Sequence, residues 1–502
     1  MPTIELLRLE WATFRRPGRL IALAAAALSV VTLGLLAAAA NRPTCDGPCP
    51  AVAGDVRGIA DRFWFLHRDL GREGSITVRL TSMTGTITYP PPNHDQIVAG
   101  LVPWAKVGVI VKDGVRPGSS YAAVMMTGTH GVRFQHGYSG DVAGREGGVT
   151  PQSPRWLRLT RSGDTITGAE SVDGDRWATV GTAVLTGLPD TVSVGLFAAS
   201  PGDLTLRRVG LGGVVEEVRF TQAVGVFDHV AVDGGATGAW RSEPVGGEMN
   251  VTDWERLHHA SGVTEKDDMI TVSGSGDIGP LSDEGVVTVT TILIGLAFGL
   301  TVVLVVAARH GSRTARERIC RRRTAARAVV VGLSGLATGL VAVGVVLPVG
   351  FAVLRANGAP LATMPLLTSL RVVVGVASAV ALGAVLAFAL GVRLRRGRTA
   401  IPIVLSLVVL PYIVTAVPLL PDHVSEWLLR LTPAAGFAVQ QTLVEYPQVI
   451  AHYAPSTGYF PLPWWAGLLV LVAYTATAVR VSLLTGPTSG ASTEPTQGRG
   501  GN

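Results

Sequence analysis

The chain has 502 residues, of which 48% are hydrophobic and only 16% charged, and its mean hydropathy is +0.39. This composition is too apolar for an ordinary soluble protein of the same length, so we expect a membrane protein. The net charge is +6, but the basic residues are nearly all Arg and lie beside apolar runs instead of on one contiguous face. That distribution indicates membrane topology and argues against nucleic acid as a partner.

Residues 1–19 are predicted to form a short cytoplasmic interfacial helix. An apolar run at 20–40 follows, and it is long enough to cross a bilayer. A cleaved secretory signal is the alternative because Ala37 to Ala40 are small, but the length of the run and the acidic Glu5 and Glu10 favour a retained transmembrane helix. The interfacial helix mixes arginines with apolar side chains, as helices in a membrane surface do, namely Leu6, Leu7, Leu9, Trp11 and Phe14.

Two cysteines follow the first apolar run in the sequence TCDGPCP, at Cys45 and Cys49. On the predicted topology they lie in an oxidising space, and the Asp-Gly-Pro between them permits a tight turn. We therefore predict a local disulfide between them. Cys320 lies in a predicted cytoplasmic loop and is expected to stay reduced.

Residues 41–285 are predicted to form an external all-β domain and a segment that returns the chain to the membrane. Strand-length segments such as SITVRLTSMTG, WAKVGVIVKDG and TVSVGLFAAS are bounded by turn residues. Leu157 and Leu159 alternate with Arg158 and Thr160, which is the period of a half-buried strand. The return segment contains MITVSGSG, which we expect to add a strand to the domain. A β-sandwich with little helix is therefore expected.

The series FWFLHRDLGREGSITVRLTSMTG, PWAKVGVIVKDG and SSYAAVMMTGTHGVRFQH resembles the concanavalin-like jelly-roll domain of the lectin and laminin G type, over roughly residues 54–219. In that superfamily the concave sheet often binds glycans, so the resemblance makes cell-wall glycan a candidate ligand. Sugar rings stack on aromatic side chains. The residues expected on such a face are Trp104, Tyr121, His130, Phe134 and His136. Core or rim positions for most of them are the alternative.

The sequence does not indicate an enzyme, and no cofactor or metal is expected to bind this chain. A glycosidase needs two carboxylates across the scissile bond, but Glu170, Asp173 and Asp175 lie in and beside a VDGD turn, where acidic residues are expected on conformational grounds. His258 and His259 are adjacent and lack a metal motif such as HExxH.

Five further apolar runs are predicted to span the membrane, at 286–307, 328–353, 366–392, 401–420 and 464–484. Arginines crowd the segments before the first span, between the second and third, and between the fourth and fifth, whereas the opposing short connections carry only Arg355 and Arg430. By the positive-inside rule both termini are cytoplasmic and the β domain is external. Residues 485–502 are rich in Gly, Ser, Thr and Pro, so we expect a disordered cytoplasmic tail.

The expected fold is thus an α-helical membrane protein with six transmembrane helices and an all-β jelly-roll sandwich inserted between helices one and two. The segment SEWLLRLTPAAGFAVQQTLVEYPQVIAHYAPSTGYFPLPWWAGLLVLVAYTATA is similar to the last external segment and final span of bacterial ABC transporter permeases of the export type. This resemblance implies a bacterial plasma membrane protein with six spans and an interfacial helix before the first. It also implies short helices between the fifth and sixth spans that dip back at the outer surface.

In such permeases the cytoplasmic connection between spans two and three docks on an ATPase subunit. The chain has no GxxxxGK[ST] phosphate loop, so ATP is expected on that partner subunit. A second permease copy or a paralogue, and the lipid bilayer, are the other expected partners. The resemblance assigns the docking role to Arg313, Arg316, Arg318, Arg321, Arg322 and Arg323.

Two alternatives to a working permease stay open. Ala308, Arg309 and His310 depart from the acidic entry to this connection that the family leads us to expect, which would suit a degraded, inactive permease. The other alternative is a non-transporting surface receptor, which would bind cell-wall glycan through its β-sandwich and use its spans as an anchor.

Overall fold

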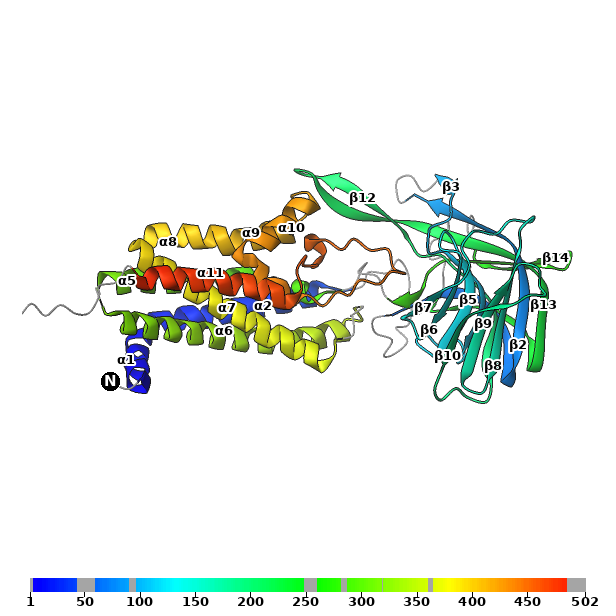
Figure 1. The fold of residues 1–502 in the computed structure, drawn as a ribbon, viewed down its shortest axis with the longest axis horizontal. Coiled ribbons are helices and arrows are strands. Elements are labelled where there is room, and N and C mark those ends of the chain that lie inside the picture. Colours follow the sequence, from blue (N-terminus) through cyan, green and yellow to red (C-terminus); the bar gives the residue numbers. More distant parts are fainter. Residues whose placement is uncertain are drawn as a thin grey trace, which may run out of the picture.

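In a computed structural model, the chain forms a bundle of long helices and a β domain placed end to end (Figure 1). The structure describes residues 3–42, 59–89, 96–247, 260–280, 287–317, 319–359 and 364–484. In chain order the strands lie between α2 (Pro17–Ala40) and α4 (Val289–Ile292). The predicted combination of long apolar helices with a β domain is confirmed.

Within the described residues, six helical segments are long and apolar enough to cross a membrane. They are α2, α5 (Leu296–Arg316), α6 (Arg321–Ala356), α7 (Leu366–Leu394), the combined segment Gly397–Ala416, and α11 (Trp464–Leu484). Glycines allow some of these helices to approach closely. A Cβ on Gly339 of α6 would lie 2.7 Å from the Cα of Ala377 in α7. Small residues at such contacts are typical of helices that pack in a membrane.

The second predicted span, 286–307, differs from the structure at both ends, because α4 is a separate short helix and α5 begins only at Leu296. The other large difference lies at the end of the bundle away from the β domain. The short helix α1 (Thr3–Phe14) precedes α2, as expected. However, α5 continues to Arg316 and α6 begins at Arg321, so much of the predicted Arg-rich loop is helical. Arg is a good helix former, and a run of charge marks where an apolar span ends, not where its helix ends.

The fifth candidate span contains an irregular turn. The helix α8 (Gly397–Val404) continues through the π-helical η1 (Leu405–Val409) into α9 (Leu410–Ala416). Pro411 lacks an amide hydrogen, and its ring crowds the carbonyl group one turn earlier, so a wider turn just before it relieves the clash. Residues 417–421 then lead to α10 (Asp422–Leu431).

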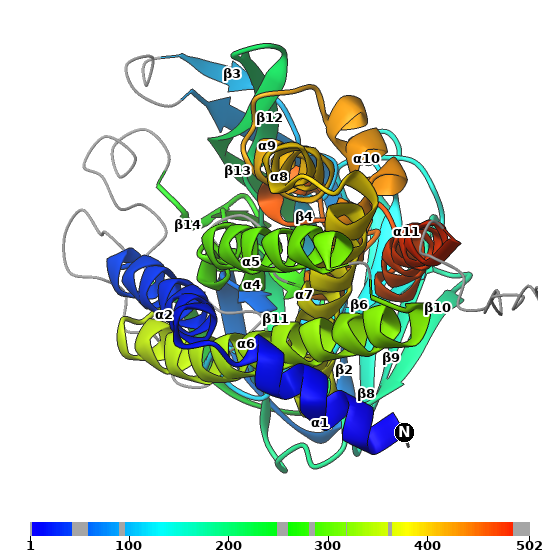
Figure 2. The ribbon, with the colours of Figure 1, turned by 90° about the vertical axis from the view of Figure 1, so that its left-hand side faces the viewer.

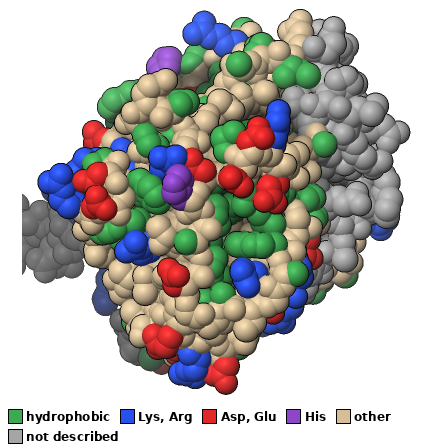
Figure 3. Space-filling model, turned by 90° about the vertical axis from the view of Figure 1, so that its right-hand side faces the viewer, with side chains coloured by type: hydrophobic (Ala, Val, Ile, Leu, Met, Phe, Trp, Pro, Cys, Tyr) green, Lys and Arg blue, Asp and Glu red, His purple; other side chains and the backbone are tan. Residues whose placement is uncertain are grey.

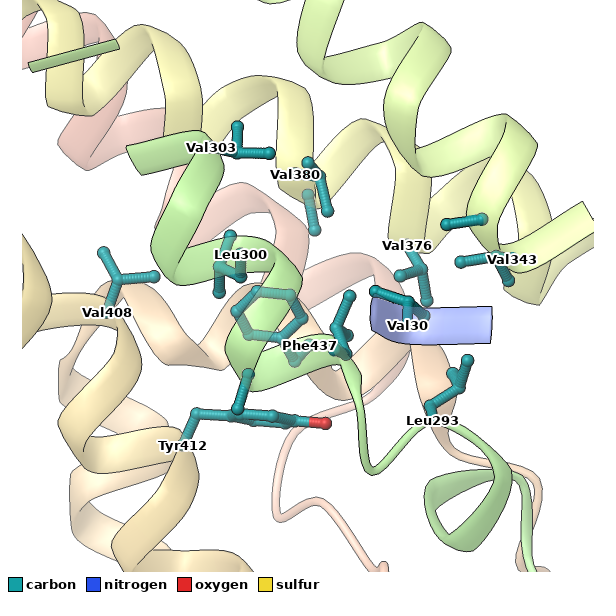
Figure 4. Close-up of a cluster of buried hydrophobic side chains, with 14 of the residues drawn as sticks. Val30, Leu293, Leu300, Val303, Val343, Val376, Val380, Val408, Tyr412 and Phe437 are labelled. Atoms are coloured by element: carbon teal, nitrogen blue, oxygen red, sulfur yellow. The ribbon is translucent and has the colours of Figure 1, made fainter. Parts of the chain in front are cut away.

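After α10 the chain folds back into the bundle. The 3-10 helix η2 (Pro433–Gln440) packs against α7 and α11, and all eight of its residues are buried. Figure 4 shows Phe437 of this helix among Leu300 of α5, Val376 of α7 and Tyr412 of α9. The centroids of the Phe437 and Tyr412 rings lie 4.9 Å apart. We refer to η2 as the re-entrant segment; a loop at 441–463, which includes η3 (Pro455–Thr457), connects it to α11.

The described part of the β domain contains one 14-stranded sheet and a separate pair of strands, and every pairing between strands is antiparallel. The predicted strand in MITVSGSG is present as β15, which pairs with β13. The strands are β1 (Ile59–Asp61), β2 (Phe63–Thr88), β3 (Ile97–Ala99), β4 (Lys106–Lys112), β5 (Tyr121–Thr127), β6 (Val132–His136), β7 (Gly140–Ala143), β8 (Arg155–Ser162), β9 (Thr165–Ser171), β10 (Ala178–Val184), β11 (Val192–Ala199), β12 (Asp203–Val209), β13 (Gly213–Val245), β14 (Gly262–Lys266), β15 (Met269–Gly274) and β16 (Ile278–Pro280).

The two longest strands, β2 and β13, pair with each other along their length and bend together. Phe63 lies opposite Val245 at one end of this ribbon, and Thr88 lies opposite Phe220 near the other. At the bend Gly234 has a φ of +89°, and a Cβ on it would lie 2.6 Å from the Cα of Gly74. Only residues without a side chain allow two backbones to approach this closely.

The bend divides the large sheet into two layers. The first half of β2 pairs with β11, which continues into β4, β5, β6 and β7; we refer to these strands as the β4 layer. The middle of β2, from Glu73 to Leu80, pairs with β8, which continues into β9 and β10, and these form the β8 layer. Val109 of β4 and Leu157 of β8 belong to one fully buried core between the layers. This arrangement agrees with a sandwich, and the finer jelly-roll assignment stays a prediction.

Candidate functional site

Exposed arginines gather where α5 ends and α6 begins. Figure 2 looks onto this end of the bundle, where α1 crosses in front of α6. Of the six predicted docking residues, Arg313, Arg316, Arg321 and Arg322 are exposed, Arg323 is half-buried, and Arg318 lies outside the described residues. Only residues 317–320 separate the two helices. We call this part of the molecule the arginine end.

Arg323 belongs to an ion-pair network that the sequence did not reveal. Glu10 of α1 is fully buried, and its carboxylate accepts hydrogen bonds from the Nε atoms of Arg323 and Arg327, each at 2.6 Å. Arg327 also donates to the hydroxyl of Thr314 at 3.0 Å, and its Nη1 lies 2.5 Å from Oε2 of Glu317. The network therefore joins α1, the last turns of α5 and the first turns of α6.

Electrostatics and aromatic contacts both hold α1 in place. Burial acts to raise the pKa of Glu10, but the hydrogen bonds and charges of Arg327 and Arg323 outweigh it, so the pKa lies below its ordinary value. Glu10 is thus ionised at neutral pH. At the end of α1, the buried Phe14 ring meets His310 edge-on, with ring centroids 5.3 Å apart. The helix α1 is therefore docked on the bundle at two points.

At the opposite end of the bundle, the loop at 441–463 contacts the β domain. The side-chain amide of Gln448 donates to the carbonyl oxygen of Ser139 at 3.2 Å. His452 is buried between two carboxylates, with Nε2 2.8 Å from Oδ2 of Asp422 and Nδ1 3.4 Å from Oε1 of Glu216. Asp422 begins α10 and Glu216 lies on β13, so this imidazole bridges the helical bundle and the β domain.

The hairpin of β12 and β13 makes a second contact between the two parts. A Cβ on Gly213 would lie 2.1 Å from the carbonyl oxygen of Pro418, so the backbones touch where α9 leads into α10. Figure 1 shows β12 reaching from the β domain towards α10. In the sequence, the re-entrant segment lies between α10 and the loop that carries His452.

The five residues predicted to form a glycan-binding face do not lie together. Tyr121 and Phe134 are both fully buried and point into different cores, on opposite sides of the β4 layer. Trp104 and His130 do meet, because their rings stack with centroids 4.0 Å apart. His136 is half-buried beside Phe134, with ring centroids 5.7 Å apart. The register between β5 and β6, in which Val124 lies opposite Phe134, decides which side of the sheet each residue faces. That register could not be read from the sequence alone.

The outer side of the β4 layer is covered by other parts of the same chain. Tyr121, Phe65 and Phe197 are buried there together with Ile278 of β16. Two buried lysines of β4 hold the cover in place. Lys112 donates to Oδ2 of Asp61 at 2.7 Å, and Lys106 donates to Asp277 and to the carbonyl oxygen of Ile278. A sugar therefore cannot stack on Tyr121 unless this cover is displaced.

The remaining candidate residues are the cysteines, the adjacent histidines and the acidic residues of the VDGD turn. Cys45, Cys49, His258 and His259 lie outside the described residues, and Cys320 is exposed as a free thiol. Asp173 accepts backbone hydrogen bonds from Asp175 and Arg176, in keeping with a turn role. Over the described ranges, no group of three His, Cys, Asp or Glu side chains could hold a metal ion. Figure 3 shows acidic and basic side chains interspersed on the face of the β domain opposite the bundle.

Comparisons with known proteins assign no family. No family model and no curated protein matches the chain. Among solved structures, a functionally unknown protein from Saccharomyces cerevisiae is 17% identical, with 35% of this chain and 75% of that one covered and a TM-score of 0.21. SCP-B, a member of the eqolisin family of peptidases, and scytalido-glutamic peptidase are 8% and 10% identical, with 43% of this chain and 98% of theirs covered and TM-scores of 0.26 and 0.25. At such TM-scores no argument about fold or activity follows.

Proposed function

We propose that the chain is the membrane-spanning permease subunit of an export-type ABC transporter, powered by a separate ATP-binding subunit. The arginine end is the observation that carries this proposal. Its four exposed arginines lie in the last turn of α5 and the first turn of α6, on either side of a short connection, and the buried network around Glu10 fixes these two helix ends. A positive surface that is held in place in this way is better suited to docking on a protein than to acting as a mobile tether to anionic lipids.

The arrangement of the helices supports the same function. The helix α1, the junction of α5 with α6, the junction of α7 with α8, and the C-terminal end of α11 lie at one end, while the β domain lies at the other (Figure 1). With six spans, and by the positive-inside rule, the arginine end is cytoplasmic and the β domain, inserted between the first and second spans, is external. Both termini then lie on the cytoplasmic side.

A force applied at the arginine end has a continuous route to the outer end. The helix α6 has 36 residues, which corresponds to a length of about 54 Å. Both α5 and α6 pack along α7, and α7 contacts the re-entrant segment. Closure of an ATPase subunit could thus move the helices that surround Phe437. A second copy of the chain or a paralogue would complete the transporter. The glycan-receptor alternative receives less support, because its five candidate side chains form no common exposed face.

Affinity purification from native membranes in mild detergent tests the proposal. The variant replaces Arg321 and Arg322 with Glu, and the matched control replaces Arg396 and Arg398 with Glu. All four arginines are exposed at the starts of α6 and α8, where Glu suits the helix N-terminus. We expect wild type and control to recover an ATP-binding subunit and the variant to lose it. Recovery with the variant, or none with folded wild type, would refute the proposal.

A further inference from the structure

A cavity of about 380 Å³ lies at the joint between the β domain and the loop at 441–463. Its walls come from the loop before β4, the start of β12, the segment before β16, and residues 448–450. The volume lies within the range of about 300 to 1,000 Å³ that is usual for small-molecule sites. A ligand there would touch both the β domain and the loop that follows the re-entrant segment.

The cavity wall is mainly apolar and partly rigid. Val102, Trp104 and Leu204 line it from the β domain, and Val449 and Ile450 line it from the loop. Trp104 is 4% exposed, and His130 stacks on its ring with centroids 4.0 Å apart. The indole is thus held in position before any ligand arrives. Preformed apolar walls with a few polar groups are what small-molecule sites generally show.

Two carboxylates supply the polar groups. Asp203 accepts a hydrogen bond from Nε of Arg219 at 2.7 Å through Oδ2, and Asp277 pairs with Lys106 through Oδ1. Oδ1 of Asp203 and Oδ2 of Asp277 take no part in hydrogen bonds among the described residues. Both aspartates line the cavity, whereas their basic partners do not. The wall therefore offers hydrogen-bond acceptors and disfavours an anion.

We infer that this cavity binds a small, mainly apolar molecule that carries a hydrogen-bond donor such as a hydroxyl or amine. The bound molecule joins β12 to the loop beside Gln448, and so strengthens the joint between the β domain and the bundle. Because β12 belongs to the hairpin that touches Pro418, a ligand in the cavity affects the position of residues 417–421, which lead through α10 to the re-entrant segment. The inference goes beyond the proposed transport function and does not depend on the ATPase subunit.

Photolabelling of the full-length chain in lipid nanodiscs tests this site. The first probe is a trifluoromethyl aryl diazirine with a benzyl alcohol group, and the second has a benzoate group in its place. Adducts are mapped by mass spectrometry, with exposed helix residues Leu28 and Phe298 as the internal standard for labelling from lipid. We expect the alcohol to label Val102 or Trp104, excess non-photoreactive alcohol to abolish that labelling, and the benzoate to leave both unlabelled.

A filling substitution localises the labelling. Leu204→Trp places a larger side chain at the cavity wall, whereas Leu206→Trp, on the same strand and 48% exposed, serves as the control. We expect loss of the Val102 and Trp104 adducts in the first variant and wild-type labelling in the second. Three results in the wild type would overturn the inference, however the variants fold. They are labelling that excess alcohol does not remove, equal labelling by the benzoate probe, and the absence of labelling at Val102 and Trp104.

Discussion

Replacing Glu10 with Gln tests whether the buried network holds α1 on the bundle. Gln keeps the shape of the side chain but removes the charge that faces Arg323 and Arg327. Removing one partner of a buried ion pair costs about 3 to 5 kcal/mol. The lower end applies here, because Arg327 retains Glu317 and Thr314 and the Arg323 side chain is 37% exposed. We therefore expect the free energy of opening α1 to fall by about 3 kcal/mol.

Hydrogen exchange in nanodiscs, read by mass spectrometry, measures this opening directly. A loss of about 3 kcal/mol raises the exchange rate of the α1 amides by roughly a hundredfold, at 1.36 kcal/mol for each factor of ten. Glu5→Gln is the matched control, since Glu5 is exposed on the same helix. Adding Arg327→Gln to Glu10→Gln should restore part of the protection, because the buried guanidinium of Arg327 then no longer lies beside a neutral amide. Unchanged exchange of α1 in Glu10→Gln would refute this account of the network.

Further predictions concern pH, the re-entrant segment, the joint and the β domain. Folding lowers the pKa of Glu10, so the stability that its carboxylate contributes is present above the unfolded pKa of about 4.3 and is lost as the pH falls below that value. In this low-pH range the exchange rate of the α1 amides, corrected for the intrinsic rate, should rise in the wild type and should not rise in Glu10→Gln. Phe437→Ala should lower the free energy of unfolding by about 3 to 5 kcal/mol, seen as a lower Tm, whereas Phe298→Ala, at a 63% exposed site, should change it little. Gly213→Val should push the hairpin of β12 and β13 away from Pro418, so that limited proteolysis cuts the hairpin faster. Leu211 is 80% exposed in the same hairpin, and Leu211→Ala should leave the cleavage rate unchanged. Asp61→Asn leaves Lys112 buried without its carboxylate and should destabilise the β domain by about 3 kcal/mol in a tryptophan-monitored melt, while Asp113→Asn should be nearly neutral.

The positions of the long helices could be predicted because apolar length is a local property of the sequence. The last helix has the predicted range, 464–484, and the first begins only three residues before its predicted start. The added strand β15 could be recognised from the alternation in its own residues. The end of α5 and the start of α6 could not be predicted, because the same arginines both indicate the membrane topology and continue the helices.

Contacts between distant residues could not be predicted from a single sequence. Glu10 and Arg327 are separated by 317 positions, and no local pattern marks them as partners. The division of Tyr121 and Phe134 between two cores depends on strand register. The cover over Tyr121 depends on β16, which lies far along the chain from β5. The candidate glycan residues were chosen for their chemistry, and their burial became visible only in the assembled domain.

The native Cys320 allows the most direct test of docking at the arginine end. This exposed thiol lies in the short connection between α5 and α6, next to Arg321. A benzophenone maleimide attached to it in native membranes would be photoactivated, with Cys320→Ser as the control, and the cross-linked partners identified by mass spectrometry. The account predicts a protein with a GxxxxGK[ST] phosphate loop, joined only when Cys320 is present. Cross-links to lipid alone, or to proteins without a nucleotide site, would contradict it.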